Sequence, residues 1–228
     1  MTVSHGEALP TGAASSSGFR DPGTLTRSLK LFLYLGIALG ALSIVSELLE
    51  LQQLNEMRPT DLAGEVDVSD FQGIMAILQL LNLVVLIVLF CIWIYRANSN
   101  ARQFGATDMQ FSPGWSVGWY FIPIANLWKP YQAMREIWQA SADPAHWQQQ
   151  PRGAILPLWW TFFLLSNFVG NASFRLSLRA QTVSDLILAG AVSVANDAVN
   201  IGSDVVALVL VTRIFRMQMT RRAADAFV

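Results

Sequence analysis

The sequence predicts an all-α membrane protein with four transmembrane helices, and three observations support this fold class. Hydrophobic residues make up 53% of the 228 residues, and charged residues make up only 14%. A soluble domain usually carries about 25% charged residues, so part of this chain needs lipid around it. The mean hydropathy is +0.40. Apolar stretches long enough to cross a bilayer, which takes about 20 residues, recur four times along the chain.

The expected membrane domain covers residues 25–222, between two tails. We place the four spans at about 29–49, 74–95, 154–173 and 193–213. The first two are joined by an acidic loop at 50–73, and the fourth apolar region is longer than a bilayer requires, so part of it projects outside. Residues 1–24 are rich in Ser, Gly and Thr and are expected to be a disordered tail. Residues 223–228 form a C-terminal tail.

The first span contains a pair of small residues, Gly36 and Gly40, at a spacing that lets another helix approach closely. The pair could serve dimerisation. We favour the interpretation that it packs against another helix of the same chain.

Between the second and third spans lie a proline-broken segment and an amphipathic helix. Residues 113–128 are apolar but too short to span, and Pro123 interrupts them, which is typical of a re-entrant or interfacial segment. Pro130 stands where a helix can begin. An amphipathic helix of the interfacial type is expected at 130–141, with Tyr131 and Met134 on its apolar face.

The basic residues predict the orientation of these spans. All of the 15 Lys and Arg residues except Arg58, Arg175 and Arg179 fall on the side of the two termini and of residues 96–153. By the positive-inside rule, both termini and the 96–153 region are expected in the cytoplasm. If residues 113–128 crossed the membrane, the C-terminal arginines would lie outside and this asymmetry would weaken.

Charge and rare residue types exclude several classes of function. The net charge is −1, so a nucleic-acid partner is not expected. The single cysteine, Cys91, excludes an intrachain disulfide and a cysteine-rich metal site. The two histidines, His5 and His146, are too few for a histidine cluster. We therefore expect no metal site and no cofactor.

The sharpest candidate site is a polar cluster in the fourth span. Asp197, Asn200 and Asp204 are spaced i, i+3, i+7 and share one helix face. A carboxylate in hydrocarbon usually faces a bundle interior or a watery cavity. Counting helical rise puts Asn82 and Asn167 in the outer half of their helices. These five residues are expected to bind a cation, a proton or a small polar solute. The alternative shifts the bilayer toward the C-terminus and leaves Asp197 in outside water.

A second candidate site lies in the region assigned to the cytoplasm. Its expected members are Arg96, Arg102, Asn126, Lys129, Arg135 and Glu136. One interpretation is a polar pocket under a re-entrant elbow that binds an anionic ligand or a lipid head group. The favoured alternative is an interfacial belt of tryptophans, with the cations in contact with anionic lipid head groups.

Enzyme signatures are absent from the sequence. It contains no glycine-rich phosphate loop, no His-Glu-x-x-His and no nucleophile elbow, so no catalytic residue is assigned. Three function classes remain: a non-enzymatic binding or scaffold component, which we favour; a small-solute, ion or proton pathway through the fourth helix; and a membrane-embedded enzyme. The expected partner is the lipid bilayer, and the oligomeric state is left open.

The region from Trp93 to Trp138 carries a family resemblance. Its longest run, from Trp115 to Trp138, reads WSVGWYFIPIANLWKPYQAMREIW and resembles the core signature of the domain of unknown function 4328 family. Further residues that fit this family are Trp93 to Asn98, Asn100, Arg102, Gly105, Val211 to Arg213 and Gln218. The resemblance covers roughly residues 30–220. It implies a bacterial multi-span protein of the inner membrane and supplies no activity. The polar run from Asn196 to Asp204 departs from the pattern, so the resemblance implies no role for it.

Overall fold

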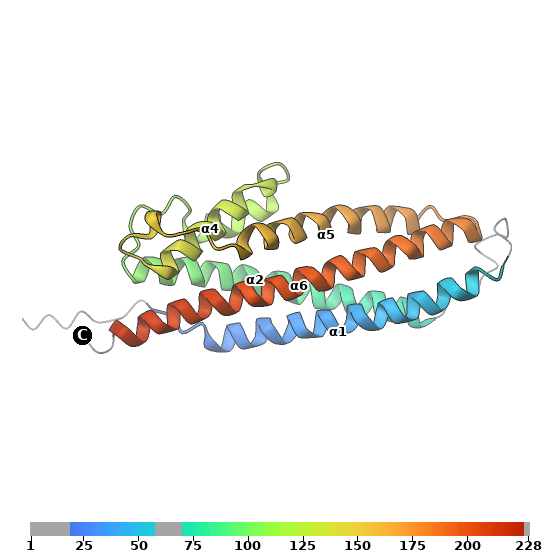
Figure 1. Cartoon of the computed structure of the whole chain (residues 1–228), viewed down its shortest axis with the longest axis horizontal. Coiled ribbons are helices and arrows are strands. Elements are labelled where there is room, and N and C mark those ends of the chain that lie inside the picture. The colour runs from blue at the N-terminus through green and yellow to red at the C-terminus, as the bar shows by residue number, and fades with distance from the viewer. Residues whose placement is uncertain (1–18, 58–69, 226–228) are drawn as a thin grey trace, which may run out of the picture.

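The computed structural model describes residues 19–57 and 70–225, and this part of the chain is all-α (Figure 1). Its long helices are α1 (Gly23–Leu54), α2 (Asp70–Gln103), α5 (Ile155–Ser177) and α6 (Val183–Asp225). Between α2 and α5 lie the short helices α3 (Pro113–Gly118), η2 (Trp119–Phe121), η3 (Ala125–Leu127), α4 (Lys129–Ala142) and η4 (Trp147–Gln149). All four long helices are long and apolar enough to cross a membrane. The predicted fold class is confirmed.

Successive long helices run in opposite directions, so the bundle has two distinct ends (Figure 1). At the end that we call proximal, α1 begins, and α2 and α6 end. At the distal end, α1 and α5 end, and α2 and α6 begin. The chain leaves α2 and enters α5 at the same, proximal end, where α3 and α4 lie (Figure 1). Residues 113–128 therefore return to the end from which they came and do not cross the bundle.

The long helices extend past the predicted spans at both ends. Residues 23 and 24 already belong to α1, although the sequence assigned them to a tail, and α6 continues to residue 225. The acidic loop is correspondingly shorter, since α1 ends at Leu54 and α2 begins at Asp70. A helix of 43 residues such as α6 measures roughly 64 Å, about twice the thickness of a bilayer core. The remaining tail residues, 1–18 and 226–228, and residues 58–69 of the loop lie outside the described residues.

The buried core of the bundle lies toward the proximal end. Leu29 of α1, Trp93 of α2, Leu156 of α5 and Leu210 of α6 pack there in one cluster with Ile137 of α4. α6 packs along both α1 and α5, and α2 packs along α1. In the described part of the chain, contacts between α2 and α5 are few, and they include the ring pair of Phe90 and Trp159, whose centroids are 6.3 Å apart. A space lined by all four helices can therefore form between them.

The helix α4 is amphipathic, as predicted, but protein covers its apolar face. Ala133, Met134, Ile137 and Ala140 are buried in the core cluster, and α4 contacts α2, α5 and α6. The expected interfacial helix is thus docked on the end of the bundle. Pro130 lies in its first turn, where the missing backbone N–H costs no hydrogen bond.

Candidate binding cavity in the helix bundle

A cavity of about 530 Å³ lies between the four long helices. All five residues of the predicted polar membrane cluster line it: Asn82 from α2, Asn167 from α5, and Asp197, Asn200 and Asp204 from α6. These residues are up to 122 positions apart in the chain, and helical periodicity with counted depth predicted that they lie close together. The sequence reasoning missed several further polar residues of the lining, which are Gln79, Ser166, Asn196 and Ser203.

The glycine pair of α1 makes room for this polar face of α6. A Cβ atom on Gly36 would collide with the Asp204 carboxylate and would lie 3.0 Å from Nδ2 of Asn82. A Cβ atom on Gly40 would lie 3.0 Å from Cγ1 of Ile201. The pair therefore packs within the chain, against α6, which is the interpretation preferred over dimerisation. The Asp204 carboxylate occupies the space that a side chain at position 36 would fill.

Asp197 is held inside the bundle by neighbouring helices. Its side chain is 5% exposed. Its Oδ2 accepts a hydrogen bond of 3.3 Å from Nε2 of Gln79 in α2, and Ser43 of α1 forms a further side-chain hydrogen bond. The carboxylate therefore contacts protein groups of α1 and α2.

Several acceptor atoms of the lining lack a hydrogen-bond partner. Asn82 is only 7% exposed, and its Oδ1 has no partner, like Oγ of Ser166 and Oδ1 of Asn196. Asp204 forms no side-chain hydrogen bond within the described part of the chain. Asn167, another member of the predicted cluster, donates from Nδ2 to the carbonyl of Phe163, at 2.7 Å. Leaving such atoms unsatisfied costs about 1–3 kcal/mol each, so a guest whose donor groups reach them would be stabilised.

The titratable side chains of the cavity are all carboxyl groups. Among the described residues that line it there is no Lys, Arg or His, whereas two carboxylates, Asp197 and Asp204, are present. The nearest basic residue toward the C-terminal end of α6, Arg213, is nine positions beyond Asp204 and exposed. A cation in the cavity would therefore meet carboxyl and amide oxygens and no basic side chain.

Polar residues continue from the cavity toward the distal end, along the interface of α1 and α6. Ser193 donates from Oγ to Oε1 of Glu47 at 2.5 Å, and Oε2 of Glu47 is buried without a partner. Because the two helices are antiparallel, Gly36, Ser43 and Glu47 of α1 face Asp204, Asp197 and Ser193 of α6 in that order. The sequence reasoning missed Glu47. Matching spacings of 4, 7 and 11 residues on the two helices are the signal that could have found it.

The residues of the predicted cytoplasmic pocket do not form one site. Arg102 donates from Nη2 to the carbonyls of Met109 and Phe111, at 3.0 and 2.9 Å. The Glu136 carboxylate accepts hydrogen bonds from the backbone N–H groups of Gln110 and Phe111, at 3.3 and 3.2 Å. Both side chains therefore fix the loop that follows α2.

Burial has a direct electrostatic consequence for Glu136. It raises the pKa of this carboxyl, because the charged form loses hydration. The hydrogen bonds from the loop and the charges of Arg135 and Arg102 act in the opposite direction. Arg135 and Glu136 also line an open hollow of about 560 Å³ together with Arg152 and Asp108.

The remaining members of the predicted pocket lie apart. Nζ of Lys129 lies 5.5 Å from the ring centroid of Phe111 and 5.7 Å from that of Trp119. Asn126 lies beside α5, and its Oδ1 is buried without a partner. These side chains therefore contact different parts of the protein, because α4 and its loops are folded against the bundle.

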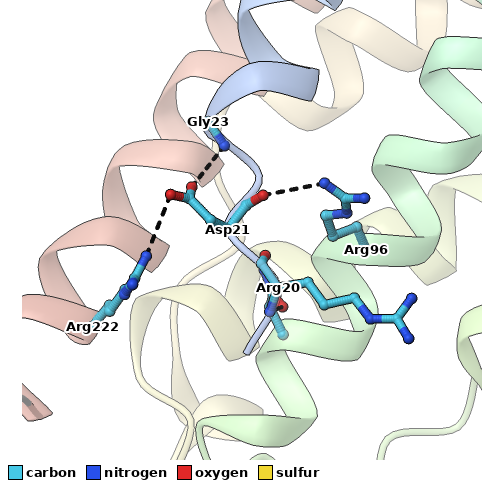
Figure 2. Close-up of polar contacts among 6 residues, drawn as sticks. Arg20, Asp21, Gly23, Arg96 and Arg222 are labelled. Atoms are coloured by element: carbon cyan, nitrogen blue, oxygen red, sulfur yellow. Dashed lines mark hydrogen bonds and ion pairs between the residues drawn. The ribbon is translucent and has the colours of Figure 1, made fainter. Parts of the chain in front are cut away.

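Arg96 belongs to a clasp around the start of α1 (Figure 2). It donates from Nη1 to the carbonyl of Asp21 at 3.1 Å. The Asp21 carboxylate accepts a hydrogen bond from the backbone N–H of Gly23 at 2.8 Å, and it forms an ion pair with Nη1 of Arg222 at 3.5 Å. Arg20 exchanges two backbone hydrogen bonds with the side chain of Asn100, at 3.2 and 3.1 Å. The residues before α1 thus join the proximal ends of α2 and α6.

Residues that carry the family resemblance build the proximal end. Asn98 donates from Nδ2 to the carbonyl of Phe111 at 3.0 Å and to Oγ of Ser116 at 2.8 Å. Gln218 donates from Nε2 to the carbonyl of Ala97 at 2.9 Å and to Oγ of Ser141 at 3.0 Å. The structure therefore accounts for these residues as a framework that joins α2, α3, α4 and α6.

Comparison with known proteins gives one match. The family model described as Domain of unknown function (DUF4328) matches residues 60–216. No curated protein and no solved structure matches the chain. The matched region runs from before α2 into α6, so it includes every cavity residue except those of α1.

Proposed function

This chain belongs to the family of the Domain of unknown function (DUF4328), and from that premise we propose that it is a non-enzymatic binding protein of the membrane. It is a multi-span membrane protein with four candidate transmembrane helices. Its ligand is a small polar solute that occupies the cavity between α1, α2, α5 and α6. The family description supplies no activity, so the support comes from the residues of this chain.

One observation carries the proposal: a cavity of about 530 Å³ with a polar lining lies inside an apolar bundle. Ligand sites in proteins are typically concave, largely apolar spaces of a few hundred Å³ with a small number of placed polar groups. The apolar part of this lining includes Leu83 and Leu86, and its polar part includes Asn82 and Asp204. Polar residues at membrane depth are costly and usually mark a functional site.

We further infer that the protein lies in a bacterial cytoplasmic membrane with its proximal end toward the cytoplasm. Among the described residues, the distal end carries only two basic residues, Arg175 and Arg179, whereas the other Lys and Arg side chains belong to the proximal end. This distribution supports the positive-inside orientation. The bacterial origin rests on the family resemblance.

Access to the cavity can be tested with cysteine variants. In a Cys91→Ser background, Asn200→Cys introduces a thiol at the cavity wall, and Leu210→Cys introduces one in the packed core, where Leu210 is fully buried. A charged thiol reagent is expected to modify position 200 and to leave position 210 unmodified. A solute that occupies the cavity should slow the reaction at position 200. If position 200 is as unreactive as position 210, the scaffold interpretation replaces the binding one.

A second candidate function, a solute or ion pathway, is favoured by the polar residues between the cavity and the distal end. Glu47 with Ser193, and Ser43 with Asp197, extend the polar lining along α1 and α6. The core cluster at the proximal end argues against an open channel in this conformation. Uptake of a solute into proteoliposomes, compared between the parent and Glu47→Leu, tests this candidate. The enzyme alternative has no comparable observation in its favour.

A further inference from the structure

We propose that the ligand of the cavity is a small alkylammonium, a short hydrocarbon that carries one or two primary ammonium groups. This inference rests on the proposed function, because it names the chemical class that the same cavity would bind. It is carried by three properties of the lining: the acceptor atoms without partners, the spacing of the carboxylates and the apolar surfaces between them.

The acceptor atoms favour a ligand that donates hydrogen bonds. Asn82 is more than nine-tenths buried, it lines the cavity, and its Oδ1 has no partner. Oγ of Ser166 and Oδ1 of Asn196 are also buried without partners in the same lining. A primary ammonium group has three N–H donors and no acceptor. With the Asp204 carboxylate it would form charge-assisted hydrogen bonds, which are stronger than those between neutral groups.

The arrangement of the carboxylates disfavours a bare metal ion. In the described part of the chain, no group of three or more His, Cys, Asp or Glu residues could hold one. Asp197 and Asp204 are seven residues apart on α6, which corresponds to about 10 Å along the helix. One small ion cannot contact both carboxylates. A diamine can place one ammonium group near each carboxylate, and a monoamine can bind at Asp204 alone.

The rest of the lining suits the hydrocarbon part of such a ligand. Leu39, Leu83, Leu86 and Phe163 contribute apolar surface between the polar groups. The Phe163 ring can also stabilise a nearby cation through its π face. The helices α2 and α5 make few contacts with one another in the described part, and the lining includes side chains with large exposed areas, such as Leu83. A molecule with an alkyl chain can therefore approach from the lipid side of this gap.

Four probes test the inference on the full-length protein in detergent: 1,4-diaminobutane, butylammonium, butane-1,4-diol and potassium chloride at matched ionic strength. Thermal unfolding is followed by tryptophan fluorescence for three proteins. They are the parent, Asp204→Asn, which keeps the shape but removes the charge, and Asp108→Asn as control. Asp108 is exposed and outside the cavity, and its φ of 59° is one that Asn also adopts readily.

The expected result is that both amines raise the unfolding temperature of the parent and of Asp108→Asn, and that the diol and potassium do not. Asp204→Asn should weaken the apparent amine affinity by about tenfold or more, because a charge-assisted hydrogen bond is lost. Protection of Asn200→Cys from a thiol reagent gives a second readout with Asp204 intact, in case Asp204→Asn does not fold. There, the amines should slow modification and the diol should not.

Other outcomes overturn the inference in distinguishable ways. Equal stabilisation and protection by the diol would mean that the cavity binds neutral polar solutes. The proposed binding function would then be supported, and the proposal of an amine ligand would be wrong. A matching effect of potassium chloride would assign the site to an inorganic cation. If no probe changes either readout and position 200 is unreactive, both the amine ligand and the proposed binding function are wrong.

Discussion

The close approach of α5 and α6 depends on the absence of a side chain at Gly202. A Cβ atom at this position of α6 would lie 2.8 Å from Cζ and 3.0 Å from Cδ1 of Phe162 in α5. Atoms at such distances overlap, so Gly202→Ala has to displace an aromatic ring or push the helices apart. Overpacking of this kind costs about 1–3 kcal/mol. Replacing Gly by Ala inside a helix raises the free energy of unfolding by about 0.5–1 kcal/mol. The net expectation is a loss of about 1 kcal/mol in the free energy of unfolding, within a range of roughly 0–2.5 kcal/mol.

A matched control is available in α2. Gly73 is also helical and exposed, and a Cβ atom there would meet no atom within 4 Å. Gly73→Ala should therefore show only the gain of about 0.5–1 kcal/mol. In thermal unfolding of a chain of this size, each kcal/mol corresponds to about 2–4 °C. The two glycine variants should thus shift the unfolding temperature in opposite directions.

The ring itself can be tested with a double-mutant cycle. In a Phe162→Leu background the smaller side chain removes most of the overlap, so Gly202→Ala should cost less than it does in the parent. The difference between the two costs is the interaction energy of positions 162 and 202. A clash between position 202 and the Phe162 ring is ruled out if Gly202→Ala is as stable as Gly73→Ala, or if its cost is the same with Phe and with Leu at position 162.

Three further predictions concern titration, the cavity and the topology. Burial raises the pKa of Glu136 above its ordinary 4.5. At a pH between 4.5 and the raised pKa, the folded state therefore holds a proton that the unfolded state has released. The stabilisation that this proton provides is complete below pH 4.5 and is lost as the pH rises through the raised pKa. Glu136→Gln should remove this part of the slope when unfolding temperature is measured against pH. Asp204→Asn should preserve the unfolding temperature in detergent, whereas Asp204→Leu should lower it by a few degrees, because it leaves the facing amides without a polar neighbour; equal stability of both would make Asp204 a bystander. Reporter fusions after Gln148 and at the C-terminus should read cytoplasmic and a fusion after Gln181 should read external, and an external reading at the C-terminus would refute this topology.

The sequence predicted the four long apolar helices because each contains a long apolar window, which is a local property. It kept residues 113–128 apart from these four helices, as the structure does, because Pro123 and the short length are also local signals. It could not predict what covers the apolar face of α4. Periodicity identifies Met134 and Ile137 as one face, but a lipid surface and a protein surface impose the same pattern. The structure buries both residues in the core cluster.

The candidate site was likewise predicted only in part from local signals. Asn82 and Asn167 could be joined to the α6 cluster because helical rise gives depth, and depth is shared by all helices of a bundle. The rotation of each helix is not given by depth. For this reason the sequence did not predict that Asn167 bonds to the carbonyl of Phe163, or that Glu47 continues the polar lining. These features depend on the register between helices, which is set by tertiary contacts such as Gly36 against Asp204.

The volume of the cavity limits what can give a ligand its affinity. A space of about 530 Å³ has room for many water molecules, each of which takes about 30 Å³ in the liquid. Water can satisfy Oδ1 of Asn82 and Oγ of Ser166 almost as well as a neutral ligand can. A diol would therefore exchange hydrogen bonds of similar strength and gain little. An ammonium group instead supplies an opposite charge to Asp204 in a region of low dielectric constant, where that attraction is stronger than in bulk water. The preference for an amine over its neutral analogue is thus the measurement that separates charge recognition from simple filling of a wet cavity.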